Sequence, residues 1–262
     1  MEDTGHYLQR MRARAPLVQN ITNNVAMNMM ANVQIAAGAS PAMADAAEEV
    51  VEFTALADAL TVNIGTADSL KAMSMRLAGA AMNGHGRPWV FDPVGVGATQ
   101  FRNDLCRDLL ALCPTVVRGN ASEILTLAGR AKGARGVDAV DSVASAEAAA
   151  RELAGRTGHI VVATGPLDYV TDGARALRVA NGDPMMAKIT VSGCSLNGVI
   201  AAFLVDQPPL EATAAALAYY GLAGERAAAV CAGPGTFQPA FLDALYALTP
   251  EDVTQGARIE AA

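Results

Sequence analysis

The stretch PWVFDPVGVGAT, residues 88–99, joins a short run of aromatic and β-branched residues to a turn rich in glycine. A short apolar run bounded by proline and glycine is typical of a buried strand. Three further runs of this kind, at residues 59–67, 114–124 and 159–170, also end in turn-forming or reactive residues. Their recurrence predicts a sheet built from several short strands.

Alanine-rich segments with helical spacing lie between these runs, for example at residues 68–82 and 140–154. Strands that alternate with helices form βαβ units, whose parallel sheet is covered by helices on both faces. A further helical pattern extends over residues 209–247 and is broken at AGPGTF, residues 232–237. We therefore expect an α/β fold with a parallel sheet.

A chain of 262 residues can form one large α/β domain, and we expect a single domain over residues 1–262. Residues 129–136 are interpreted as one loop, and residues 251–262 as polar enough to fray. The stretch KITVSGCSLNGVIAAF, residues 188–203, is interpreted as the end of a strand, a turn of small residues and an apolar helix.

The composition disfavours several kinds of partner. A net charge of −7 argues against nucleic-acid binding, which depends on clustered lysine and arginine. The longest apolar runs, such as residues 199–205, are far shorter than the roughly 20 residues of a membrane span. Four cysteines without a CxxC pair, and an N-terminus unlike a signal peptide, indicate a reducing cytoplasm.

Chemically useful side chains follow the predicted strands, namely Asp92, Arg118, Glu123 and Thr164. The carboxyl ends of parallel strands line up along one edge of a sheet, so these residues are expected to face one site. Two carboxylates, a guanidinium and a glycine-lined helix start are the parts that phosphoryl transfer requires. The glycines of GVGAT fit neither the Walker pattern nor GxGxxG, which disfavours a P-loop nucleotidase and a Rossmann dehydrogenase.

Cys194 has two interpretations. A free cysteine is most often a small buried hydrophobic residue. Cys194 also follows Ser192 and Gly193 at the expected start of a helix, where the dipole and the exposed N–H groups would lower its pKa and favour a thiolate.

Seven stretches between residues 16 and 203 form a larger pattern. In order they are PLVQNITNNVAMNMMAN, GASPAM, LTVNIGT, VFDPVGVGAT, VVRGNASEI, TGPLDYV and SGCSLNGVIAAF. This series resembles the hydroxyethylthiazole kinase family of the ribokinase-like superfamily, and DPVGxGAT together with RGNxSEI is specific to that family. The resemblance implies a three-layer α/β/α sandwich with a mostly parallel central sheet, ribokinase-like but without a lid.

The activity implied by the resemblance is transfer of the γ-phosphate of ATP to the hydroxyl of 4-methyl-5-(2-hydroxyethyl)thiazole, with Mg²⁺ as cofactor. Arg118 and Thr164 correspond to positions that contact ATP. Asp92 and Glu123 match the acidic residues expected near Mg²⁺, directly or through water. Two carboxylates with phosphate oxygens and water satisfy such a hard cation. The family assembles as a homotrimer with active sites between subunits.

The resemblance also implies roles in catalysis and substrate binding. Cys194 stands where related sugar kinases have an aspartate, and would accept the proton of the attacking hydroxyl beside an anion hole around Gly193. Met43 corresponds to a thiazole contact, and Asn23 lies in the same substrate region. Val191 replaces the Gly or Ala of the family. Because a β-branched residue disfavours positive φ, either the backbone there is extended, or the turn is tilted and substrate contact altered.

Other functions share part of this pattern. Another small-alcohol kinase, or an ATP-dependent NAD(P)H-hydrate dehydratase, would have the same fold, but the dehydratases keep an aspartate at the position of Cys194. A non-catalytic nucleotide-binding protein is disfavoured because Asp92, Arg118, Glu123 and Cys194 are all present.

Overall fold

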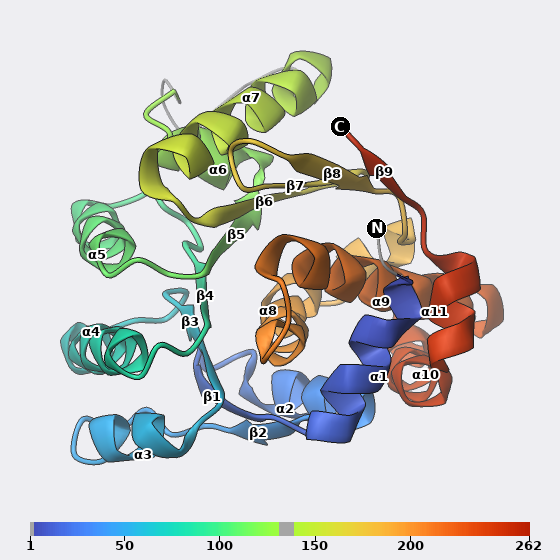
Figure 1. Ribbon diagram of the computed structural model, residues 1–262, viewed down its shortest axis with the longest axis horizontal. Coiled ribbons are helices and arrows are strands. Elements are labelled where there is room, and N and C mark those ends of the chain that lie inside the picture. The colour runs from blue at the N-terminus through green and yellow to red at the C-terminus, as the bar shows by residue number, and fades with distance from the viewer. Residues whose placement is uncertain (1–2, 131–138) are drawn as a thin grey trace.

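The computed structural model describes residues 3–130 and 139–262, which form two helical layers around one central sheet (Figure 1). In this described part the sheet has nine strands in the order β2-β1-β3-β4-β5-β6-β7-β8-β9. Neighbouring strands from β2 to β6 in that order are parallel, and β7, β8 and β9 are added antiparallel. The expected three-layer sandwich with a mostly parallel sheet is confirmed.

The strands are short, and the central ones are covered on both faces. Their bounds are β1 Leu17–Ile21, β2 Ser40–Ala42, β3 Ala59–Asn63, β4 Trp89–Asp92, β5 Val116–Asn120, β6 Ile160–Thr164, β7 Asp168–Thr171, β8 Ala176–Val179 and β9 Ile259–Ala261. Every residue of β3 and β4 is buried. This burial explains why the sequence shows continuous apolar runs instead of alternation.

Two groups of helices cover the curved sheet (Figure 1). The outer group is α3 Val50–Leu56, α4 Ser69–Gly84, α5 Gln100–Ala111, α6 Ala121–Leu127 and α7 Ala139–Thr157. The inner group is α1 Thr4–Arg14, α2 Met27–Ala37, α8 Ser192–Leu204, α9 Pro209–Val230, α10 Pro234–Ala247 and α11 Pro250–Gly256. Among the described helices, none is both long and apolar enough to cross a membrane.

Most helical predictions are confirmed, and two local interpretations are wrong. Helices α4 and α7 form where periodicity indicated them, and the break between α9 and α10 falls at AGPGTF. The C-terminal residues do not fray: they form α11, and β9 pairs with β8. Lys188 ends a 3-10 helix, Pro184–Lys188, and not a strand. Most of the loop expected at residues 129–136 lies outside the described residues.

Helix α8 sits close to α2 because Gly198 has no side chain. A Cβ atom on Gly198 would lie 2.3 Å from Gln34 Nε2. Gln34 is fixed in turn, since its Nε2 donates to Asn20 Oδ1 at 2.9 Å and its Oε1 accepts from Asn20 Nδ2 at 3.3 Å. Gly198 therefore sets how near α8 comes to α2.

Gly198→Ala should lower the free energy of unfolding by about 1–3 kcal/mol, because the added methyl group overpacks a fixed amide. Gly155→Ala is the matched control. Gly155 also lies in a helix, α7, but a Cβ atom on it would meet nothing within 4 Å. Alanine there should stabilise by about 0.5–1 kcal/mol. Urea unfolding measures the free energy of unfolding of both variants. If alanine stabilised the protein equally at the two positions, the close contact of α8 with Gln34 would be contradicted.

Candidate active site

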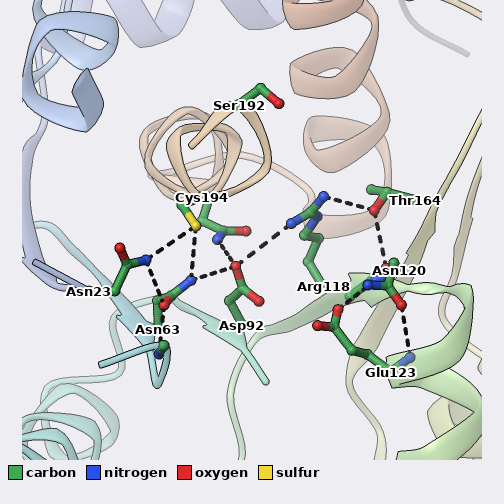
Figure 2. Close-up of polar contacts among 12 residues, drawn as sticks. Asn23, Asn63, Asp92, Arg118, Asn120, Glu123, Thr164, Ser192 and Cys194 are labelled. Atoms are coloured by element: carbon green, nitrogen blue, oxygen red, sulfur yellow. Dashed lines mark hydrogen bonds and ion pairs between the residues drawn. The ribbon is translucent and has the colours of Figure 1, made fainter. Parts of the chain in front are cut away.

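Polar side chains form a row along the carboxyl ends of the parallel strands. Asn63 ends β3, Asp92 ends β4 and Thr164 ends β6. Asn23 follows β1, and the first turn of α8 brings Cys194 over the same edge (Figure 2). The strand ends thus lie along one edge of the sheet, as expected for parallel strands.

Asp92 is a buried carboxylate with an unequal set of partners. Its side chain is 1% exposed, and its Oδ2 accepts from Asn63 Nδ2 at 2.8 Å and from Asn197 Nδ2 at 2.6 Å. Arg118 Nη1 lies 3.7 Å from the same oxygen, whereas Oδ1 has no hydrogen-bond partner. Burial raises the pKa of Asp92 to about 6, and the charge of Arg118 opposes this rise.

Arg118 lies between Asp92 and Thr164 and contacts both. Its Nη2 donates to Thr164 Oγ1 at 2.8 Å, and Thr164 donates to the carbonyl of Gly119 at 3.2 Å. A Cβ atom on Gly193 would lie 2.9 Å from Arg118 Nη1. The glycine at the start of α8 thus allows the guanidinium to approach the helix backbone, between Asp92 and Thr164 (Figure 2).

The Cys194 thiol faces two amide side chains. Its Sγ accepts from Asn23 Nδ2 and from Asn63 Nδ2, each at 3.3 Å. Burial raises the pKa of Cys194, and the charge of Asp92 raises it further, while the two amides and Arg118 act in the opposite direction. The prediction that the helix start lowers this pKa is therefore wrong, because desolvation outweighs the favourable donors.

Glu123 joins the start of α6 to the loop after β4. Its Oε2 accepts from the backbone N–H of Asn120 at 2.8 Å, and Asn120 Oδ1 accepts from the N–H of Glu123 at 3.0 Å. This reciprocal pair is a capping box. Its Oε1 accepts from the N–H of Gly95 at 3.1 Å. The charge of Glu123 also raises the pKa of Asp92.

The two carboxylates suit a cation that takes few ligands from the protein. No group of three or more His, Cys, Asp or Glu residues in the described part of the chain is placed to hold a metal by itself. A hard cation such as Mg²⁺ commonly uses one or two carboxylates, with water and phosphate oxygens filling its other positions. The free and buried Oδ1 of Asp92 fits a ligand of that kind.

Val191 adopts an uncommon backbone conformation at the N-cap of α8. Its φ is 75° and its ψ is −6°, in the left-handed region. The extended alternative considered for this residue is thus wrong. Left-handed geometry costs a residue other than glycine roughly 1–2 kcal/mol. The turn is held by a hydrogen bond of 2.8 Å from Ser195 N–H to the Val191 carbonyl, and by one of 2.7 Å from Tyr220 to the Ser192 carbonyl.

Met43 lies at the far end of the row. It is half-buried and directly follows β2, with β1 and β3 between its strand and that of Asp92. The order of strands therefore places Met43 and Asn23 at one end, and Arg118 and Thr164 at the other.

A pocket of about 690 Å³ opens beside Arg118, Thr164 and Gly193. It reaches Tyr220 on α9, and Asp168 forms part of its wall. The volume is in the range of pockets that bind small molecules and cofactors. Asp168 Oδ1 accepts from the N–H of Gly165 at 2.9 Å, and burial raises the pKa of Asp168 to about 6.

Three residues of this site have no role in the sequence analysis, namely Asn63, Asn197 and Asp168. Asn63 is visible in sequence only as the last residue of a strand. Asn197 gave one local signal, since asparagine in the middle of an apolar helix has poor helix propensity. Asp168 lies in the stretch TGPLDYV, but no local pattern indicated its role, because its partial burial depends on segments that are distant in the chain.

The fold is that of a ribokinase-like α/β protein. A ribokinase-like superfamily protein from Enterococcus faecalis V583 superposes with a TM-score of 0.66 at 15% identity, covering 92% of this chain and 93% of that chain. At that identity the likeness shows the fold alone.

The chain belongs to the hydroxyethylthiazole kinase family, whose model matches residues 8–251. A hydroxyethylthiazole kinase from Cereibacter sphaeroides is 58% identical over 262 residues, which is the full length of both chains. The solved structure of a hydroxyethylthiazole kinase protein from Pyrococcus horikoshii OT3 is 37% identical, covers 100% of both chains and gives a TM-score of 0.93. The resemblance noted in the seven stretches is confirmed.

Asp168→Asn should remove a cost of folding that depends on pH. Burial raises the pKa of Asp168 from 3.8 to about 6, so the folded protein holds a proton that the unfolded chain releases. The stability contributed by this group is present at low pH and is lost as pH rises from about 4 to about 6. Relative to wild type, the variant should gain about 1–3 kcal/mol at pH 7.5 and much less at pH 4.5. Urea unfolding of the variant and of wild type at both pH values measures the difference in the free energy of unfolding. The same difference at pH 4.5 and pH 7.5 would contradict a raised pKa of Asp168.

Proposed function

We propose that this protein transfers the γ-phosphoryl group of ATP to the hydroxyl of 4-methyl-5-(2-hydroxyethyl)thiazole, a step of thiamin synthesis or salvage. The observation that carries the proposal is the polar row at the carboxyl edge of the sheet, in a chain of this family. The row has a cationic side chain and a pocket at one end, and Asn23 with Met43 at the other. A donor and an acceptor could therefore meet near its middle, where Asp92 and Cys194 lie.

ATP would bind in the pocket of about 690 Å³, with its phosphates toward Arg118 and Thr164. The Arg118 guanidinium can donate two hydrogen bonds to phosphate oxygens. It also donates to Thr164, which places both residues at this end of the row. The N–H groups around Gly193, at the start of α8, would stabilise the negative charge that develops during transfer.

Mg²⁺ is the proposed metal cofactor, and Asp92 and Glu123 are the residues that would hold it, directly or through water. Bound there, it would neutralise charge on the phosphates. The support from this chain is the bare Oδ1 of Asp92, which is buried without any partner.

The thiazole is proposed to lie near Met43, Asn23 and Val191, with its hydroxyl toward Cys194. Cys194 would accept the proton of that hydroxyl. Since burial raises the thiol pKa, the thiolate is a minor form at neutral pH. A loose transition state requires little help from a base, so a small thiolate population can serve.

The proposed assembly is a homotrimer in the cytoplasm, each subunit a single domain over residues 1–262, with active sites between subunits. An exposed apolar stripe on α4 supports a subunit interface. Its members Leu70, Met73 and Leu77 are 69%, 43% and 40% exposed and are spaced to share one helix face. A monomer in light scattering at assay concentrations would contradict this assembly.

An ATP-consumption screen tests the substrate. The acceptors are hydroxyethylthiazole, hydroxymethylpyrimidine, pyridoxal and ribose, each with MgATP. Hydroxyethylthiazole should give the highest kcat/KM, and its phosphate should be identified by mass. Faster phosphorylation of the pyrimidine would overturn the assignment.

Variants of Cys194 test its role as proton acceptor. Cys194→Ala should keep the fold but lower kcat by roughly 10²- to 10⁴-fold, the usual contribution of a positioned base. Cys194→Asp should retain substantial activity, because a carboxylate can accept the same proton. Cys194→Ser should resemble the alanine variant, since a hydroxyl is a poor base.

A purely structural thiol predicts a different order. It would tolerate Ala and Ser, and Asp would be destabilising because its charge would be desolvated. Steady-state kinetics and thermal unfolding of the three variants distinguish the two roles. An active, stable alanine variant beside an unfolded aspartate variant would refute the catalytic role.

A further inference from the structure

The orientation of the Asn63 amide is fixed by its neighbours. Its Oδ1 accepts from the backbone N–H of Gly65 and from Asn23 Nδ2, each at 3.0 Å. A backbone N–H can only donate, so the oxygen must face Gly65 and the amino group must point the other way. There Nδ2 donates to Asp92 Oδ2 at 2.8 Å and to Cys194 Sγ at 3.3 Å. Asn63 thus connects the carboxylate with the thiol.

Asn197 holds the same carboxylate from helix α8. It lies three residues after Cys194, so the two side chains share one face of the helix. Its Nδ2 donates to Asp92 Oδ2 at 2.6 Å, and Asn197 is itself only 1% exposed. This contact accounts for an asparagine in the buried part of α8.

Both amides bind one oxygen of Asp92 and leave the other bare. Oδ2 takes the two hydrogen bonds and faces Arg118, while the buried Oδ1 has no partner. A buried carboxylate oxygen without a partner is costly. A carboxylate held through one oxygen cannot rotate freely, so the other oxygen keeps a fixed direction, as in metal sites whose ligands are held by outer hydrogen bonds.

We propose that Asn63 and Asn197 are positioning residues, which hold Asp92 through Oδ2 so that Oδ1 stays free for the metal ion that accompanies the nucleotide. Asn63 additionally ties this carboxylate to the Cys194 thiol, and Asn197 does not. The inference rests on the proposed kinase function, because it concerns the same site.

Alanine variants separate these contacts, because each asparagine touches a different set of groups. Of the two functional groups, Asn197 bonds only to Asp92, Asn23 bonds only to Cys194, and Asn63 bonds to both. Asn23 also donates to Asn63 Oδ1, but the N–H of Gly65 still fixes that amide when Asn23 is replaced. One readout is the affinity of the protein–ADP complex for Mn²⁺, measured by electron paramagnetic resonance of free Mn²⁺. The other is the rate of Cys194 alkylation by iodoacetamide, measured by peptide mass. Neither readout requires thiazole turnover.

Asn197→Ala should weaken Mn²⁺ binding about tenfold, as expected for an outer partner of a metal ligand, and leave Cys194 alkylation close to wild type. Asn23→Ala should do the reverse, with alkylation slowed several-fold because the thiolate loses a donor. Asn63→Ala should change both readouts. This crossed pattern is the result expected from the geometry.

Thr213→Ala is the control for loss of a buried polar side chain. Thr213 lies on α9, and its buried hydroxyl has no partner, so both readouts should stay at wild-type values. Wild-type Mn²⁺ affinity in Asn63→Ala and Asn197→Ala would overturn the inference. So would equal shifts of both readouts in all three asparagine variants, which would indicate general loosening. If the crossed pattern appears but hydroxyethylthiazole is not phosphorylated, the proposed function fails and the positioning role stands.

Discussion

The burial of the Asp92 carboxylate is the constraint on which the rest of the site depends. A charge in the interior is stable only if donors surround it, and here the donors come from three elements. Asn63 comes from β3, Arg118 from β5 and Asn197 from α8. The position of each of these three elements therefore affects how readily Asp92 ionises. For this reason the packing of α8 influences a carboxylate at the end of strand β4.

Small residues make that packing possible. Gly198 lets α8 approach the Gln34 amide of α2, and Gly193 lets the Arg118 guanidinium approach the first turn of the same helix. The apolar part of α8 from Val199 to Leu204 is fully buried and anchors the helix. This buried part of the helix helps to hold its first turn over the polar row.

Several features of the site oppose stability. Val191 has left-handed backbone geometry, Asp92 has a bare buried oxygen, and burial raises the pKa of Asp92 to about 6, which is a cost at neutral pH. Such strain persists only where the surrounding structure enforces it, and it gathers at functional sites. The buried core on both faces of the sheet supplies that enforcement. These features lie around the start of α8, where the proposed active site is.

The sequence by itself determined the parallel sheet, most of its helices and the reactive residues at the strand ends, because periodicity and turn residues are local properties. Seven ordered stretches also identified the family. Only the tertiary structure decided that the Cys194 pKa is raised, that Val191 is left-handed, and that the C-terminal segment joins the sheet. The same is true of Asn197 and Asp92, which are 105 residues apart in the chain and bond to each other. Burial and long-range hydrogen bonds depend on which distant segments of the chain come into contact. Local sequence patterns do not predict those contacts.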